Sequence, residues 1–90
     1  MIELIWDTGF KRAYKKRIAL DPVRKDRFWS ALDLFVSDPF AHVLRTHKLT
    51  GKLSGCWAFS VEHDCRVVFQ FVNGQRKALL IDVGTHEEVY

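Results

Sequence analysis

The second half of the chain alternates between apolar and polar residues with a period of two, which is typical of β-strands. The alternation covers residues 57–62 and residues 66–71, and an apolar run follows over residues 77–83. Two turn signals separate these segments. The first is Glu62-His63-Asp64, and the second is Asn73-Gly74, whose residues both tolerate positive φ. The pattern therefore predicts three strands joined by two hairpins.

The first half of the chain has apolar residues at helical spacing instead. A short strand is predicted over residues 2–6, and Asp7 or Thr8 would cap a helix directly after it. Asp21 suits the N-cap of a second helix, which Ser37-Asp38-Pro39 would end. The inward stripes comprise Phe10, Ala13, Tyr14 and Ile18 in the first helix, and Phe28, Leu32, Phe35 and Val36 in the second.

The predicted order is one strand, two helices and a three-strand meander, with residues 40–55 connecting the helices to the meander. This order predicts an α+β fold in which both helices pack on one face of a small, mostly antiparallel sheet. The other face would stay partly open and carry Ser60 and Arg66. A chain of 90 residues that is 48% hydrophobic suffices for one core, so residues 1–90 are expected to form a single domain.

The chain has no apolar run near the ~20 residues that a membrane span requires. Its first six residues have neither the basic start nor the long apolar centre of a signal peptide, so we expect a cytoplasmic protein with no membrane partner. Cys56 and Cys65 make no disulfide framework and lack a second pair at zinc-site spacing. We interpret both as packing residues and expect no metal and no small-molecule cofactor.

Basic residues are unevenly distributed in a chain whose net charge is only +3. They concentrate on the first predicted helix, at Lys11, Arg12, Lys15, Lys16 and Arg17. Three explanations fit this concentration: a solvated helix face, a nucleic-acid contact, or contact with an acidic protein. The charge pattern alone does not choose among them.

The segment after the last predicted strand ends in His86 and Tyr90. A histidine is suited to proton transfer near neutral pH, whereas a polar tail clamped by one aromatic is the structural alternative. Together with His47, Asp64 and Arg66, these side chains would suit metal-independent cleavage of RNA by attack of the ribose 2′-hydroxyl on the adjacent phosphate. Each has a simpler explanation as well, since Asp64 is also a common turn former.

Three motifs together resemble the RelE/ParE superfamily of bacterial toxins, and most closely its RelE/StbE and YafQ-like branch. The first runs from Leu49 and Gly51 to Gly55 and an aromatic, the second is Asp64-x-Arg66, and the third is Gly84-Thr85-His86 with a terminal aromatic. The length and the predicted element order resemble this family too. The resemblance implies a toxin of a type II toxin–antitoxin system that cuts mRNA in the ribosomal decoding site and is restrained by a cognate antitoxin.

The resemblance also implies roles for single residues. His47, Asp64, His86 and Tyr90 match positions used in catalysis and in holding the message, and Arg66 matches the arginine that binds the scissile phosphate. His86 is the leading acid–base candidate. Ser60 stands where YafQ-like enzymes carry another active-site histidine, and this departure leaves the division of acid and base roles open.

The resemblance further implies that the basic residues contact ribosomal RNA or the antitoxin. The predicted RNA-binding set is Lys11, Arg12, Lys15, Lys16, Lys48 and Lys52. Two alternative functions share the same fold. One is a ParE-like inhibitor of DNA gyrase, which needs no terminal histidine and aromatic. The other is a decayed toxin that serves as a non-catalytic binding module.

Overall fold

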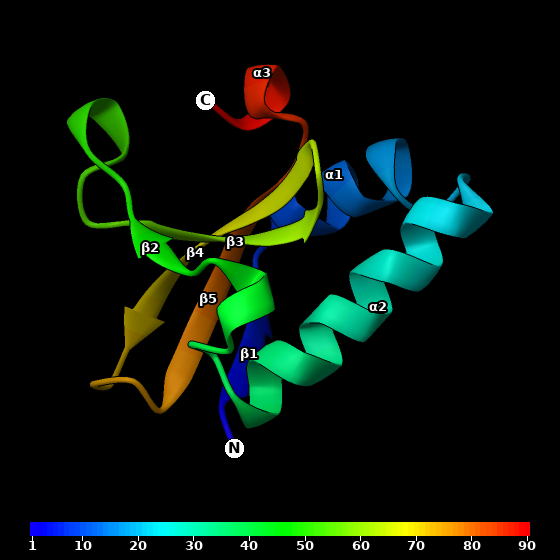
Figure 1. Cartoon of the computed structure of the whole chain (residues 1–90). Helices are drawn as coiled ribbons and strands as arrows, with labels where there is room; N and C mark the ends of the chain where they lie inside the picture. Colours follow the sequence, from blue (N-terminus) through cyan, green and yellow to red (C-terminus); the bar gives the residue numbers. More distant parts are fainter.

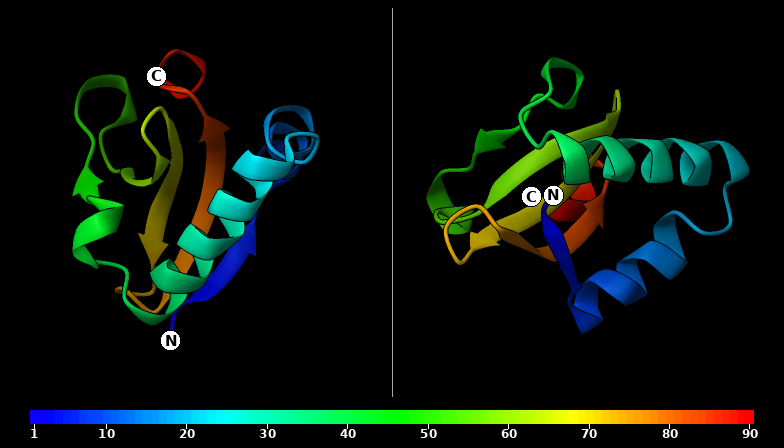
Figure 2. Two further views of the ribbon diagram at one scale, coloured as in Figure 1. Left: turned by 45° about the vertical axis from the view of Figure 1, so that its right-hand side comes forward. Right: turned by 90° about the horizontal axis from the view of Figure 1, so that it is seen from below.

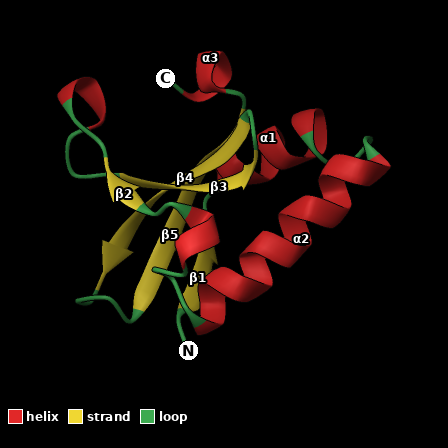
Figure 3. Ribbon diagram, in the orientation of Figure 1, coloured by secondary structure: helices red, strands yellow, loops and turns green.

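The computed structural model describes all residues from Met1 to Tyr90, and it contains a mixed five-stranded sheet with helices around it (Figure 1, Figure 3). The strand order is β1-β5-β4-β3-β2, in which β1 is parallel to β5 and every other pair is antiparallel. The elements in chain order are β1 (Glu3–Trp6), α1 (Thr8–Arg17), α2 (Pro22–Ser37), the 3₁₀ turn η1 (His42–Leu44), β2 (His47–Lys48), the 3₁₀ turn η2 (Gly51–Leu53), β3 (Trp57–Glu62), β4 (Cys65–Val72), β5 (Lys77–Gly84) and α3 (His86–Val89).

The predicted α+β fold and the strand–helix–helix–meander order are confirmed. The predicted caps are in place, since the side chain of Asp7 accepts a hydrogen bond from the Gly9 amide at 2.9 Å and that of Asp21 accepts one from the Arg24 amide at 3.1 Å. The β4–β5 turn has positive φ at Asn73 (55°) and Gly74 (68°), as its sequence predicts. Four elements were not predicted: η1, β2 and η2, inside the connecting segment, and α3, in the tail.

Both long helices contribute to one hydrophobic core, and α2 lies across the sheet (Figure 2). The Phe35 ring of α2 stacks on the Phe59 ring of β3, with ring centroids 4.5 Å apart. Trp6 of β1 lies among aromatic rings of both helices, including Phe10 and Phe28. The inward stripes read from the sequence therefore contribute to the core, except for Val36, which is half-buried and lies outside it. Ala58, on the opposite side of β3, is also fully buried, so the second face is less open than predicted.

Both cysteines are free and buried, as expected for packing residues. Cys65 belongs to the hydrophobic core, and burial raises the pKa of its thiol to about 11. No helix is both long and apolar enough to cross a membrane.

Candidate functional site

The candidate site lies where β4 begins and β5 ends. Because neighbouring strands run antiparallel, Ser60 on β3, Arg66 on β4 and Gly84 on β5 stand side by side in the sheet. The β3–β4 turn, which carries Asp64, and the tail, which carries His86, therefore leave the sheet at the same end (Figure 1). The fold thus brings together segments that are far apart in the sequence.

The tail folds into the short helix α3 because it has a capping box. The Thr85 side chain accepts a hydrogen bond from the Glu88 amide at 3.3 Å, and the Glu88 carboxylate accepts one from the Thr85 amide at 2.7 Å. The Tyr90 amide donates to the His86 carbonyl at 3.0 Å. These bonds give the last residues a defined conformation although the side chains of His86 and Tyr90 remain exposed.

Four of the five candidate residues form one cluster at this end of the sheet. The rings of His86 and Tyr90 meet edge to face with centroids 4.6 Å apart. The Arg66 guanidinium lies over the Tyr90 ring, 5.5 Å from its centroid. Asp64 accepts a hydrogen bond from the backbone amide of His86 at 3.4 Å, so its carboxylate contacts the backbone of the histidine. The cluster holds an imidazole, a guanidinium and an exposed aromatic ring together.

Arg66 is the most unusual member of the cluster. Its Nε is buried and has no hydrogen-bond partner, and the side chain makes no ion pair. An unpaired buried donor costs about 1–3 kcal/mol, so native structures contain few of them. A guanidinium with unused donors is well suited to binding a carboxylate or a phosphate, because its planar fork donates two parallel bonds.

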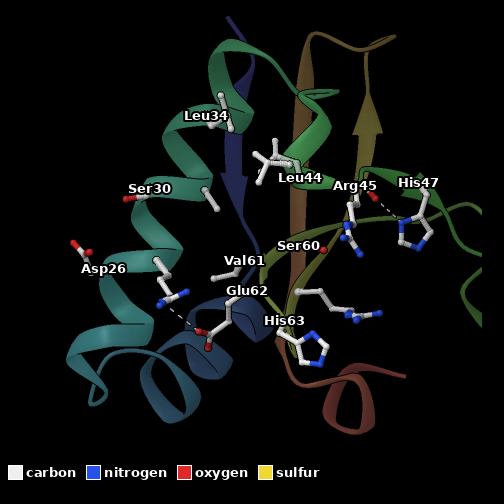
Figure 4. A pocket seen from close by; sticks show the side chains of 14 residues that line it. Asp26, Ser30, Leu34, Leu44, Arg45, His47, Ser60, Val61, Glu62 and His63 are labelled. Carbon is white, nitrogen blue, oxygen red and sulfur yellow. Dashed lines mark hydrogen bonds and ion pairs between the residues drawn. The ribbon is translucent and has the colours of Figure 1, made fainter.

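His47 lies apart from the C-terminal residues but shares a cavity with Arg66. The cavity has a volume of about 800 Å³ and lies between α2, η1 and β3 (Figure 4). Nδ1 of His47 is 2.8 Å from the carbonyl oxygen of Arg45. A carbonyl only accepts, so Nδ1 carries the proton in this contact and Nε2 of neutral His47 is left as an acceptor. The geometry therefore suits His47 to taking up a proton inside the cavity.

The predicted RNA-binding residues occupy two exposed places. Four of them lie on α1, and two lie on β2 and η2, where Lys48 sits over the Trp57 ring at 5.6 Å from its centroid. The α1 residues are Lys11, Arg12, Lys15 and Lys16, and the others are Lys48 and Lys52. None of the six takes part in an ion pair, so their charges are free to meet an external anion.

Arg17 differs from its basic neighbours and was not singled out from the sequence. Its Nη1 donates to Asp82 at 3.0 Å and to the Val83 carbonyl at 3.1 Å, and its Nε lies 3.5 Å from the Glu88 carboxylate. The residue therefore ties the end of α1 to β5 and to α3. The Thr85 backbone hydrogen bond is the main reason why the pKa of Glu88 is lowered, and Arg17 adds to the effect. Because the pKa of Glu88 is lowered, its contacts with Thr85 and Arg17 stabilise the fold at neutral pH and weaken as the pH falls through that pKa.

Gly84 has no side chain, and this leaves room for the Glu88 carboxylate and the Arg17 side chain to meet beside it. A Cβ at this position would lie 2.7 Å from Oε1 of Glu88 and 3.1 Å from the Arg17 side chain. We expect Gly84→Ala to displace the Glu88 carboxylate, break the capping box and release α3, at a cost of about 0.5–2 kcal/mol. Chemical denaturation would measure the loss of stability, and NMR would show shifted signals for His86 and Tyr90. Glu88→Ala should reproduce the change. Unaltered His86 signals in Gly84→Ala would contradict the arrangement.

No three His, Cys, Asp or Glu side chains lie close enough together to hold a metal ion. The side chains described above can transfer a proton through an imidazole, bind an anion at Arg66 and stack a ring on Tyr90.

Comparisons with solved structures show what the fold is similar to. It superimposes on the crystal structure of YafQ from E. coli with a TM-score of 0.77 and 16% sequence identity, over 100% of this chain and 99% of that chain. It superimposes on a YoeB/ParE toxin from Agrobacterium tumefaciens with a TM-score of 0.77 and 18% identity, over 94% and 99% of the two chains. It also matches YafQ in the E. coli DinJ–YafQ complex, with a TM-score of 0.73 and 16% identity, over 100% and 99%.

Sequence comparison identifies the family directly. A search of curated proteins finds no match. The profile described as "Bacterial toxin of type II toxin-antitoxin system, YafQ", however, matches residues 2–90, which is nearly the whole chain. The predicted resemblance is thus confirmed, and the chain belongs to the YafQ family of toxins of type II toxin–antitoxin systems.

Proposed function

We propose that this toxin is a ribosome-dependent endoribonuclease that cuts mRNA by attack of a ribose 2′-hydroxyl on the adjacent phosphate. The observation that carries the proposal is the cluster in which Arg66, with its unpaired buried Nε, lies beside Tyr90 and His86. The reaction needs a bound phosphate, two proton transfers and an ordered nucleotide. The cluster and the adjoining cavity contain a side chain suited to each requirement.

Arg66 is assigned to the scissile phosphate. Its guanidinium would donate to the non-bridging oxygens and stabilise the charge that develops on them in the transition state. The 2′-oxygen loses its proton and bonds to phosphorus, and the bond from phosphorus to the 5′-oxygen breaks. The products are a 2′,3′-cyclic phosphate and a 5′-hydroxyl that has gained a proton.

His86 is the leading candidate for one proton transfer, and His47 is the candidate for the other. His86 adjoins Arg66 through the Tyr90 ring, and His47 shares the cavity of Arg66 with its Nε2 available. Asp64 supports His86 by accepting the hydrogen bond of its backbone amide, which fixes the start of α3. We therefore assign Asp64 as a positioning residue.

The partners in this proposal are an antitoxin, the ribosome and its message. The E. coli YafQ structure with DinJ is a complex between such a toxin and its antitoxin, and we propose a cognate antitoxin for this chain as well. The exposed basic residues of α1, together with Lys48 and Lys52, would contact ribosomal RNA through its phosphates. With these partners the protein would act in the cytoplasm.

A cleavage assay with purified protein tests the proposal. The wild-type chain is added to ribosomes programmed with a defined message, and primer extension maps the 5′ ends of the fragments. We expect cuts in the translated message and none in the same RNA without ribosomes. An intact message together with inhibited supercoiling by DNA gyrase would favour a ParE-like activity, and an intact message with active gyrase would favour a non-catalytic module.

Tyr90→Ala separates a substrate contact from a structural clamp. Tyr90 is 43% exposed, so loss of its ring should change the free energy of unfolding little. Stacking of a base on an aromatic ring is worth about 1–3 kcal/mol, so cleavage should fall roughly 5- to 150-fold. Tyr90→Phe keeps the ring and should retain most activity. If Tyr90→Ala unfolds while Tyr90→Phe stays folded, Tyr90 is a structural clamp of the tail instead.

A further inference from the structure

Arg45 has a backbone conformation that is unusual for an arginine. Its φ is 51° and its ψ is 38°, which is the left-handed helical region. The other residue with a side chain and a positive φ is Asn73, in the β4–β5 turn. This conformation costs most residues about 1–2 kcal/mol, whereas glycine adopts it freely and asparagine with less strain. Either would make the turn after η1 at lower cost, so the arginine at this position points to a use beyond the turn.

The backbone of Arg45 orients the ring of His47. The Arg45 amide donates to the His42 carbonyl at 3.2 Å, which ends η1. The left-handed turn then brings the Arg45 carbonyl oxygen to 2.8 Å from Nδ1 of His47 (Figure 4). An extended backbone at Arg45 would rotate this carbonyl away, because ψ sets its direction. The conformation of Arg45 therefore determines which ring nitrogen of neutral His47 carries the proton.

The side chain of Arg45 is exposed and lines the cavity that also contains Arg66 and His47. Neither arginine takes part in an ion pair. The lining carboxylates are Asp26 and Glu62, and Glu62 already binds two arginines of α2 at 2.9 and 3.6 Å. The cavity thus presents two unpaired guanidinium groups, and the scissile phosphate needs only one of them. An RNA strand carries a phosphate at every nucleotide, so the second group matches the phosphate next to the scissile one.

We propose that Arg45 has two roles in the reaction: its left-handed backbone holds His47 in the Nδ1-protonated tautomer, and its guanidinium binds the phosphate that adjoins the scissile one. Both roles rest on the proposed function, in which Arg66 binds the scissile phosphate. With Nδ1 already protonated, Nε2 is the atom of His47 that accepts the proton of the 2′-hydroxyl. The second bound phosphate fixes the register of the strand in the cavity and so helps to present the 2′-oxygen to that nitrogen.

Heteronuclear NMR of the His47 ring nitrogens in the free toxin tests the first role, at a pH where the ring is neutral. We expect a proton on Nδ1 in the wild type and in Arg45→Gly, since glycine keeps the left-handed backbone. Arg45→Val disfavours that backbone because valine is β-branched, so the Nε2-protonated tautomer should predominate. A wild-type ring protonated at Nε2 would overturn this role, and so would a folded Arg45→Val with the wild-type tautomer.

Cleavage kinetics on programmed ribosomes test the second role. Arg45→Gly removes the guanidinium, and we expect KM to rise about tenfold while kcat falls no more than about threefold. The reason is that a phosphate away from the reacting bonds is bound in the substrate complex as well as in the transition state. Arg76→Gly makes the same change at an exposed arginine of the β4–β5 turn, at the opposite end of the sheet, and should cleave as the wild type does. Equal KM values for the two variants would overturn this role.

A message with one uncharged methylphosphonate linkage beside the cut identifies the group that Arg45 binds. The linkage is placed on each side of the cut in turn. At one of the two positions it should raise the KM of the wild type about tenfold and leave that of Arg45→Gly unchanged, because the contact is already absent in the variant. The same increase in both proteins would contradict an interaction between Arg45 and the neighbouring phosphate.

The NMR measurement requires neither ribosomes nor cleavage. A chain in which Arg45 sets the tautomer of His47 but which cuts no message would keep the first role and remove the proposed function. A chain that cuts message and has the same KM after Arg45→Gly would keep the proposed function and remove the second role.

Discussion

His86→Ala is expected to reduce cleavage of ribosome-bound message by about 10²- to 10⁴-fold, which is the usual contribution of one positioned acid or base. His86 begins α3 with its side chain exposed, so the substitution removes an imidazole without opening the core. Thr85 and Glu88 remain in place to cap the helix. Single-turnover cleavage on programmed ribosomes measures the chemical step separately from binding.

His63→Ala is the matched control for this experiment. His63 is also exposed, and it lies in the β3–β4 turn at the cavity, outside the cluster of Arg66, His86 and Tyr90. It should cleave within a few-fold of the wild type. If His86→Ala cuts as well as the wild type while remaining folded, the assignment of His86 is wrong.

Arg66→Met is expected to lower cleavage by about 10²- to 10³-fold while leaving stability unchanged or raising it. The loss of rate follows because methionine cannot donate to the phosphate oxygens in the transition state. The effect on stability follows because the substitution removes a buried Nε that has no partner, so no other group is left unpaired. Arg66→Lys keeps the charge but loses the planar fork, so partial activity is expected. Cleavage rates and urea denaturation give the two quantities.

Arg24→Met is the control for Arg66→Met, because it removes an arginine whose Nε does have a partner. Arg24 is also half-buried, but its Nε binds Glu62 at 2.9 Å and joins α2 to the β3–β4 hairpin. Its removal should lower the free energy of unfolding, by an amount that solvent screening keeps modest. A substrate role for Arg66 predicts a large loss of rate without loss of stability. A loss of stability in Arg66→Met equal to that in Arg24→Met would assign Arg66 a structural role.

The long helices and strands could be predicted from the sequence because their apolar residues recur at a regular spacing. The stripe that includes Phe28 and Phe35, the N-cap at Asp21 and the turn at Asn73-Gly74 are each local signals, and the structure agrees with all of them. A strand of two residues, such as β2, is too short for its apolar and polar residues to show an alternation. It exists because the backbone of His47 and Lys48 pairs with β3, and that pairing is a long-range contact.

The tail shows a signal that could have been used. Thr85 followed by Glu88 is the spacing of a capping box, and it predicts the start of a helix even where only one turn follows. The role of Arg17 had no such signal, because in sequence it is one of several basic residues between Lys11 and Arg17. Only its contacts with Asp82 and Glu88 distinguish it.

The residues of the candidate site were predicted from the sequence, but their positions relative to one another were not. Placing Asp64 next to His86 requires the register of β4 against β5, which depends on the bulge in that pair. The sequence also gave no indication that His47 would lie in a cavity with Arg66 and apart from the other three residues. Residue types predicted the chemistry, whereas strand pairing decides which groups can act together.

The burial of both cysteines makes the chain convenient for spectroscopy. A thiol with a pKa of about 11, as at Cys65, is ionised to only about one part in ten thousand at pH 7, and the thiolate is the form that reacts with maleimides. Cys56 is buried as well. A single cysteine introduced at an exposed position such as Glu87 would therefore react selectively, without removal of the native ones. A fluorophore at that position would follow the movement of α3 when message or antitoxin binds.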